Sequence, residues 1–416
     1  MTNWQIKKLG DIAQITKGKG LSKDDIVDDG KYRCVHYGEL FTKYNEVIKE
    51  VRSRTNLSDG IVLSAANDVL MPTSDVTPRG LATASSLPFS DVVIGGDVLI
   101  IRPDEDMLDG RFFAYFVAGD RHAILRLTTG STIFHLYGSD MKKLKIKLPE
   151  KPEQERIVGV LEVWDEYIEK LEQKIALKEQ LKKGLMQELF NGKRRVNSSD
   201  SKWEYTTLSN FASKSKNAIV DGPFGSQMKL SEFTSTGVPV IEMHHLKNTF
   251  IEKLSLTRFV SEDKFKRDLS RSGVCGGDII ISKTGSLGYL GLMPGGESAV
   301  ITSRLAKITI DQQMADRQFV FQYLKYMKMI GYWERIGQGG TMKILSIDNF
   351  KKMPIPNISK KEQEKLASIL DLADKEIKAL DDKRSRLVDQ KKYILKNLIT
   401  GTIRTPETLK PKGEAA

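Results

Sequence analysis

The 416-residue chain lacks the residues and segments on which several classes of protein depend. Its two cysteines, Cys34 and Cys275, lie far apart and belong to no Cys-x-x-Cys or Cys/His cluster, so we expect neither a disulfide framework nor a zinc site. No run of about 18 apolar residues is present, and the polar start MTNWQIKKLG lacks the apolar stretch of a signal peptide. We therefore expect a soluble, cytoplasmic protein without a membrane partner.

Sequence motifs of catalysis are missing as well. The chain has no G-x-x-x-x-G-K-[ST] phosphate loop, no G-x-G-x-x-G after a strand, and no Pro-Pro for the Asn-Pro-Pro-aromatic element of adenine methyltransferases. His244 and His245 are adjacent, so a helix could not direct both at one metal ion. Because no nucleophile–base pair can be named either, we predict no catalytic residue, no metal and no cofactor.

Charge of one sign is in excess, but the excess is unevenly distributed. The net charge is +11, from 65 Lys and Arg against 54 Asp and Glu. Residues 1–150 carry 20 basic and 20 acidic side chains, whereas residues 351–404 carry 14 and 8. A basic excess indicates a polyanionic partner. The neutral first part, however, could not bind such a partner through bulk charge.

The chain repeats itself at an offset of 209 residues. Glu153-Gln154-Glu155 recurs as Glu362-Gln363-Glu364, and Gly130 recurs as Gly339, with no gap in this stretch. Earlier in each half the likeness is looser and the offsets differ. Each half therefore combines a divergent N-terminal part with a constant C-terminal part.

The constant parts are predicted to form two long helices. Apolar residues follow a spacing of 4,3,4,3,4 from Ile157 to Ile175, and a similar rhythm runs from Leu366 to Leu398. Such a heptad seam is typical of helices that pack on each other, and an approximate two-fold axis would make them antiparallel. Packing of each helix on its own domain is the alternative. With nearly 40 residues, each helix should span about 55–60 Å. The expected boundary signals are Pro152 in the first turn of one helix, a Ser359/Glu362 capping box on the other, and stops at Gly192 and Gly401.

The fold class follows as α/β: two mixed α/β domains separated by two long helices that form an antiparallel coiled coil, in a pseudo-two-fold internal repeat. The predicted parts are a first domain at 1–150, a helix at 151–195, a second domain at 196–350 that opens with a polar link at 196–202, a helix at 351–404, and a mobile tail at 405–416. Predicted strands lie at 68–71, 97–101, 278–281 and 306–310, with one helix at 110–127 and one at 316–336, where Phe319, Tyr323 and Tyr326 should be core residues.

Several segments resemble the specificity (S) subunit of Type I restriction–modification systems, the HsdS-like family. Leu144–Pro149 followed by Glu153-Gln-Glu-Arg-Ile, and Met353–Pro356 followed by Glu362-Gln-Glu-Lys-Leu, are similar to the starts of that family's conserved helices. Asp221-Gly-Pro-Phe-Gly-Ser and Ser282-Lys-Thr-Gly-Ser-Leu-Gly resemble segments of its target-recognition domains. Residues 67–80 match the second of these segments only through Asp68-Val-Leu.

The resemblance implies a DNA-recognition subunit without catalytic activity. Each variable domain would read one half of an asymmetric, bipartite target in double-stranded DNA through the major groove. The helices would hold the half-sites about 34–36 Å apart. Two methylation (M) subunits would supply S-adenosylmethionine binding and adenine methylation, and restriction/translocase (R) subunits would join the full complex. The Glu-Gln-Glu segments and the outward charged residues of the helices would be candidates for docking the M subunits.

Candidate DNA contacts are flexible donors on glycine-rich loops, which can approach the phosphate backbone or base edges. In the first domain they are Lys17, Lys19, Ser74, Thr77, Arg79, Thr129, Ser131 and Thr132, and in the second Lys216, Gln227, Lys229, Lys283, Thr284, Ser286, Thr341 and Lys343. Two other functions remain open at this point. The chain could be a coiled-coil scaffold that does not bind DNA, or a DNA methyltransferase with its own catalytic domain.

Overall fold

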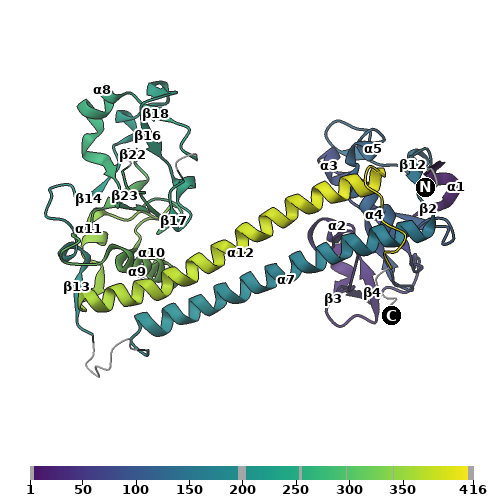
Figure 1. Ribbon diagram of the computed structural model, residues 1–416, viewed down its shortest axis with the longest axis horizontal. Helices are drawn as coiled ribbons and strands as arrows, with labels where there is room; N and C mark the ends of the chain where they lie inside the picture. The colour runs from purple at the N-terminus through teal and green to yellow at the C-terminus, as the bar shows by residue number, and fades with distance from the viewer. Residues whose placement is uncertain (1–3, 195–202, 253–254, 297, 341, 411–416) are drawn as a thin grey trace. The chain divides into compact units, whose positions relative to one another are not determined.

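The computed structural model describes residues 4–194, 203–252, 255–296, 298–340 and 342–410, and the predicted link at 196–202 lies outside them. The chain divides into two compact units (Figure 1). Unit 1 comprises residues 1–173 and 381–416, and unit 2 comprises residues 174–380. Each unit therefore contains one variable domain, a piece of the first long helix and a piece of the second.

Unit 1 is built on a four-stranded antiparallel sheet beside a second sheet of short strands. The order in the first sheet is β2 (Ala13–Lys17), β10 (Val98–Pro103), β6 (Asp68–Pro72), β8 (Ser85–Leu87). In the second it is β3 (Ile26–Val27), β5 (Arg54–Thr55), β4 (Tyr32–Val35), β9 (Val93–Ile94). Two small pairs complete the unit, β1 (Gln5–Lys8) with β12 (Lys145–Leu148) and β7 (Ser74–Asp75) with β11 (Phe134–His135). The strands predicted at 68–71 and 97–101 are confirmed.

Unit 2 repeats this plan with longer sheets. The first sheet has the order β14 (Ile219–Asp221), β23 (Leu305–Ile308), β20 (Ile279–Ser282), β21 (Leu290–Leu292), β17 (Thr249–Phe250). The second has β15 (Phe233–Thr234), β18 (Phe259–Val260), β16 (Val238–Ile241), β22 (Ser298–Ile301), β19 (Gly273–Cys275), and β13 (Tyr205–Thr207) pairs with β24 (Pro354–Pro356). The strands predicted at 278–281 and 306–310 are confirmed within two residues at each end.

The single helix predicted in each domain is wrong, because each of these segments forms two helices. Residues 110–127 form α4 (Gly110–Gly119) and α5 (Arg121–Leu125), and Asp120 leaves the helical conformation to cap α5. Residues 316–336 form α9 (Arg317–Met329) and α10 (Tyr332–Ile336), separated by Gly331 with φ of +68°. The remaining short helices are α1 (Leu9–Ile12), α2 (Glu39–Thr42), α3 (Pro78–Leu81), α6 (Gly138–Met141), α8 (Glu262–Lys264) and α11 (Ile347–Lys351).

The two long helices are α7 (Lys151–Phe190), with 40 residues, and α12 (Lys360–Thr400), with 41. The second does not begin at 351, since Pro354 and Pro356 place residues 354–356 in β24. Ser359 caps α12, accepting a hydrogen bond from the Glu362 amide at 3.3 Å. Both helices end at a left-handed glycine, Gly192 with φ of +75° and Gly401 with φ of +72°.

Ion pairs between α7 and α12 show that the helices are antiparallel within each unit. In unit 2, Lys182 pairs with Asp374, and Lys178 pairs with Glu376 at 2.8 Å. In unit 1, Lys391 pairs with Asp165, and Arg404, just after α12, pairs with Glu153 at the start of α7 at 2.5 Å. Lys182 and Lys391 occupy equivalent polar steps in the two apolar seams, and so do the two aspartates. A partly buried polar pair of this kind favours one register of a helix pair.

The helices also pack on the domain cores, so the alternative of packing on the domains holds together with the coiled coil. The core of unit 1 contains Ile157 and Leu161 of α7 and Leu398 and Ile399 of α12. A side chain on Gly119 would meet Ile399 at 2.5 Å, so this glycine allows α12 to lie against α4. In unit 2, Phe190 packs with three aromatic residues of α9, and these confirm the predicted aromatic core: Phe319, Tyr323 and the partly buried Tyr326.

The duplicated Glu-Gln-Glu segment ties each long helix to its domain. The Gln154 side chain accepts from the Asp109 amide at 2.8 Å and donates to two carbonyl groups. Gln363 accepts from the Asp316 amide in the same way, also at 2.8 Å. Both glutamines are buried, as is Glu153. The expectation that these residues dock the M subunits is therefore wrong for Glu153, Gln154 and Gln363, whose polar atoms serve the fold.

Candidate functional site

In each domain, a loop after a central strand lies beside a small hairpin from later in the chain. In unit 2, Thr284 forms a β-bridge with Ile344, and the Gly285 amide donates to the Lys343 carbonyl at 3.1 Å. In unit 1, Ser74 of β7 pairs with His135 of β11, which also bridges Thr129. Candidates that are distant in sequence, such as Ser74 with Thr129 and Thr284 with Lys343, are thus brought together at one edge of each domain.

The candidates of this edge in unit 2 differ in how free their side chains are. Ser286 is exposed. Lys283 is only 15% exposed and its Nζ lies 3.4 Å from Asp221, so its ammonium group is already partnered. The Lys343 Nζ donates to the Glu334 carbonyl at 2.6 Å, although the side chain lies at the surface. Thr341 lies outside the described residues.

The other candidates of the second domain are scattered. Gln227 and Lys229 are exposed on two short 3-10 turns that follow β14, and the Gln227 side chain accepts from the Phe224 amide at 3.1 Å. Lys216 is exposed in a turn before β14, at the end of that strand opposite Asp221. The structure therefore does not bring Lys216 to the edge that carries Thr284.

In the first domain, most candidates lie at the surface near the equivalent edge. Lys17, the last residue of β2, pairs with Asp97 at 3.0 Å, and both side chains are 55% exposed. Thr77 caps α3 by accepting from the Gly80 amide, which gives its hydroxyl a structural role. The remaining candidates of this domain are exposed, except for the half-buried Ser74: Lys19, Arg79, Thr129, Ser131 and Thr132.

A close approach of two backbone segments shapes the edge in both domains. A side chain on Gly18 would meet the Gly95 carbonyl at 2.1 Å, and one on Gly222 would meet the Thr302 carbonyl at 2.0 Å. Only glycine therefore fits at either position. The Gly18 amide donates to the Val98 carbonyl and the Gly222 amide to the Leu305 carbonyl, at 2.9 and 3.0 Å. The backbone at this edge therefore has the same arrangement in both domains.

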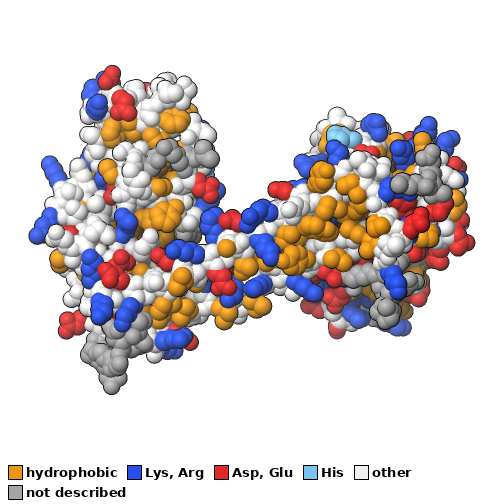
Figure 2. Space-filling model, viewed as in Figure 1, with side chains coloured by type: hydrophobic (Ala, Val, Ile, Leu, Met, Phe, Trp, Pro, Cys, Tyr) orange, Lys and Arg blue, Asp and Glu red, His pale blue; other side chains and the backbone are white. Residues whose placement is uncertain are grey.

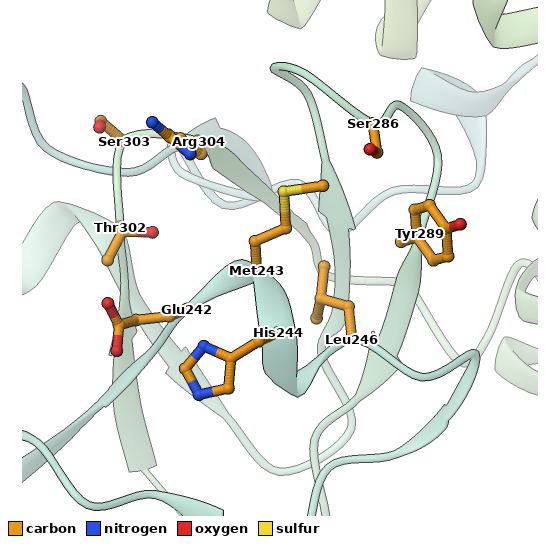
Figure 3. Close-up of a pocket in the computed structure, with 9 residues that line it drawn as sticks. All are labelled: Glu242, Met243, His244, Leu246, Ser286, Tyr289, Thr302, Ser303 and Arg304. Carbon is orange, nitrogen blue, oxygen red and sulfur yellow. The ribbon is translucent and has the colours of Figure 1, made fainter. Parts of the chain in front are cut away.

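Unit 2 has a hollow of about 600 Å³ at this edge (Figure 3). Its walls come from the turn after β16, the loop between β20 and β21, and the segment between β22 and β23: Glu242, Met243, His244, Leu246, Ser286, Tyr289, Thr302, Ser303 and Arg304. Only Ser286 was among the candidates. The sequence offered His244 only as one of two adjacent histidines, and Arg304 belongs to no motif, so neither could be selected as a site residue.

The polar groups of the hollow are partly fixed and partly free. Glu242 accepts from Arg258 at 2.9 Å, and the Glu242 amide donates to Nδ1 of His245 at 2.9 Å. Burial lowers the pKa of His245, and the adjacent His244 contributes, which favours the neutral ring that this hydrogen bond requires. Arg304 is exposed, and no described residue forms a side-chain hydrogen bond or ion pair with it.

Two kinds of feature are absent from the described part of the chain. These residues contain no group of three or more His, Cys, Asp or Glu side chains placed to hold a metal ion. None of their helices is long and apolar enough to cross a membrane. Cys34 is buried and Cys275 is exposed, and both are free thiols.

Comparisons with known proteins agree with this architecture. The chain is 22% identical over 433 residues to the Type I restriction enzyme MjaVIII specificity subunit of Methanocaldococcus jannaschii, covering 97% of this chain and 93% of that protein. It is 25% identical to the putative MjaX specificity subunit of the same organism, with coverages of 97% and 94%. In fold it is similar to the S subunit of a Type I restriction–modification system from M. genitalium, with a TM-score of 0.58, 20% identity, and 95% and 96% of the two chains covered.

The family model for the Type I restriction modification DNA specificity domain matches the chain twice. The matches cover residues 1–183 and 201–387, so each contains one variable domain and much of the long helix that follows it. The internal repeat is thus a repeat of this domain. The chain belongs to the family of Type I restriction–modification specificity subunits.

Proposed function

We propose that this chain recognises the DNA target of a Type I restriction–modification complex. Each variable domain would read one half of an asymmetric, bipartite sequence in double-stranded DNA. One observation carries the proposal: the two domains share one backbone arrangement at the edge built on Gly18 and Gly222, but present different side chains there. Two domains with the same backbone arrangement and different side chains would recognise two different base sequences, as an asymmetric target requires.

The helix pair would set the spacing of the two half-sites. Both long helices contribute to both cores, and the pairs Lys182–Asp374 and Lys391–Asp165 fix their register at two places. A sliding of one helix along the other would separate both pairs at once. We therefore assign α7 and α12 the role of a ruler between the half-sites.

We assign the chain no catalytic step of its own. The relatives carry the name specificity subunit, and methylation subunits would supply the methyl-transfer chemistry. Their docking surfaces would lie on the long helices, where each unit exposes large apolar side chains (Figure 2): Val163, Tyr167 and Tyr393 in unit 1, and Leu177, Leu181 and Leu372 in unit 2. R subunits would join the complex through the same assembly.

The test is expression of the chain with and without the M subunit of the same system, followed by purification and sequencing of methylated adenines in the host DNA. We expect a complex of the chain with M subunits, and methylation at one bipartite motif only when both are present. Methylation by the chain alone would favour the methyltransferase alternative. A complex that forms but modifies DNA without sequence preference would favour a scaffold that does not read DNA.

A further inference from the structure

We call the edge built on Gly18 in the first domain, and on Gly222 in the second, the reading edge. Backbone hydrogen bonds identify the equivalent residues of the two reading edges. The Lys283 amide donates to the Arg304 carbonyl, and the Thr73 amide donates to the Asp97 carbonyl, both at 2.9 Å. Arg304 therefore occupies in the second domain the position that Asp97 occupies in the first. The strand registers likewise place Asp221 of β14 where the first domain has Lys17 of β2.

The charges at these two positions are reversed between the domains. The first domain has Lys17 and Asp97, which neutralise each other at 3.0 Å. In the second domain Asp221 pairs instead with Arg271 at 2.9 Å and Lys283 at 3.4 Å. The reversal thus leaves Arg304 exposed and without a side-chain partner among the described residues. A guanidinium group that the fold does not use is available for a ligand.

The neighbouring turn has the same backbone arrangement in both domains but carries different side chains. The Glu242 amide donates to the His245 ring at 2.9 Å, and the His36 amide donates to the Glu39 carboxylate at 2.8 Å. The side chain that clamps the turn differs, but the turn is the same. One residue before each clamp, the second domain carries the exposed His244 where the first has Gly38. At these two positions, Arg304 and His244, the second edge therefore offers side-chain donors where the first edge has Asp97 and Gly38.

On this basis we propose that Arg304 reads a guanine in the half-site of the second domain. The inference rests on the proposed DNA-recognition function and extends it to one residue and one base. The planar guanidinium fork matches the O6 and N7 acceptors that guanine presents in the major groove. The hollow beside Arg304, between His244 and Ser286, gives room for a base edge to approach (Figure 3). The first domain cannot read guanine in this way, because Asp97 stands at the equivalent position.

A phosphate is the other anionic partner that an exposed arginine could bind. The two partners predict different results, because a phosphate contact weakens binding to all sequences and lowers its salt dependence, whereas a base contact changes the preference at one position. Arginine and lysine separate them further. Lysine can replace arginine at a phosphate, but lacks the fork that contacts two acceptors of one base.

The experiment compares the wild-type complex with M subunits to complexes of Arg304→Ala and Arg304→Lys, by sequencing methylated adenines and by competition binding to target oligonucleotides. The matched control is Arg267→Ala, which removes an exposed arginine of the same domain that pairs with Asp268. We expect both Arg304 variants to lose about ten- to a hundredfold of the preference for guanine at one position of one half-site. The other half-site and the control should retain the wild-type motif.

Replacing that guanine by 7-deazaguanine, which lacks the N7 acceptor, should weaken binding of the wild-type complex and leave the Arg304→Ala complex unaffected. A wild-type motif in Arg304→Ala overturns the inference while leaving the proposed function intact. So does uniformly weaker binding that Arg304→Lys restores, since this identifies a phosphate contact. Absence of any motif in the wild-type complex overturns the proposed function itself. Because the Arg304 side chain is exposed, thermal unfolding of the variants should match the wild type.

Discussion

The two units place equivalent aspartates between the long helices and a domain, but surround them differently. In unit 1, Asp165 accepts from Lys391 of α12 and, at 2.6 Å, from the Tyr115 hydroxyl of α4. In unit 2, Asp374 pairs with Lys182 of α7 and, at 2.8 Å, with Lys325 of α9. The link from helix to helix is repeated, and each unit also has a neutral donor from its domain, the Tyr115 hydroxyl in unit 1 and the Gln322 amide at 2.8 Å in unit 2. The difference is the second cation, Lys325, that unit 2 adds.

This difference shows which part of the repeat is constrained. The helix-to-helix pair must fix the same register in both halves, so the lysine and the aspartate are retained. The domain-facing partner only has to satisfy the carboxylate, and its chemistry has diverged. Burial lowers the pKa of Lys325 to about 8, with the nearby Lys182 contributing. Burial raises the pKa of Tyr115, and the Asp165 carboxylate beside it adds to this effect.

The largest effect should come from removing the two aspartates. Asp374→Ala leaves the ammonium groups of Lys182 and Lys325, 10% and 13% exposed, without their carboxylate. We expect a loss of about 3 kcal/mol in the free energy of unfolding. Asp165→Ala should cost less, about 2 kcal/mol, because Lys391 keeps Glu46 at 3.9 Å and the other partner is neutral.

Urea denaturation of the full chain measures both losses. Asp348→Ala is the matched control, since Asp348 forms an ion pair with Lys352 in which both side chains are mostly exposed, and should lose at most about 0.5 kcal/mol. Equal losses for Asp165→Ala and Asp374→Ala would mean that Lys325 does not increase the cost of removing the aspartate. The two units would then not differ at this position.

A smaller effect should appear as opposite pH dependence of the two units. Because the pKa of Lys325 is depressed in the folded state to about 8, its contribution to stability is present above about 10.5 and is lost as the pH falls towards 8. The pKa of Tyr115 is raised, so its contribution is present below about 10 and is lost as the pH rises further.

Urea denaturation between pH 7.5 and 10.5 separates the two groups when wild type is compared with Lys325→Met and Tyr115→Phe. Relative to Lys325→Met, wild type should gain about 2 kcal/mol between pH 8 and 10.5. Relative to Tyr115→Phe, it should lose stability above pH 10. The same sign for both variants would show that the two sites are equivalent after all.

The long helices could be predicted from sequence because their signals are local. The heptad spacing, the Ser359 cap and the stops at Gly192 and Gly401 all act within a few residues, and the structure bears each of them out. The boundary at 351 does not coincide with the start of α12, because Lys351 ends α11 and residues 354–356 form β24 before Ser359 caps the long helix. The structural role of Gln154 and Gln363 could not be predicted, because the amides that donate to them, of Asp109 and Asp316, lie more than 40 residues away in the sequence.

The reading edges were harder to predict because their equivalence lies in backbone hydrogen bonds and not in side chains. Thr73 and Lys283 hold the same place, as do Asp97 and Arg304, but neither pair matches in residue type and the loops between them differ in length. Residues 67–80 therefore resembled the second domain only through Asp68-Val-Leu, although the β6 edge folds like that of β20. Composition selected Lys283 as a free donor, whereas Asp221 already partners it.

The smallest expected effect concerns Lys283, and it tests whether a lysine at this edge serves the fold or the DNA. Lys283→Thr installs the residue type of the equivalent Thr73. Since the Lys283 ammonium already faces Asp221, we expect the slope of log affinity for target DNA against log salt concentration to stay unchanged.

Lys229→Ala removes an exposed lysine of the same domain, and should reduce that slope by about 0.9 if the side chain contacts one phosphate. The salt dependence of the two variants is compared by filter binding between about 50 and 200 mM salt. A slope that falls for Lys283→Thr would mean that DNA displaces Asp221 as its partner, so that the second edge exchanges an internal ion pair for a phosphate contact that the first edge, with Thr73, cannot make.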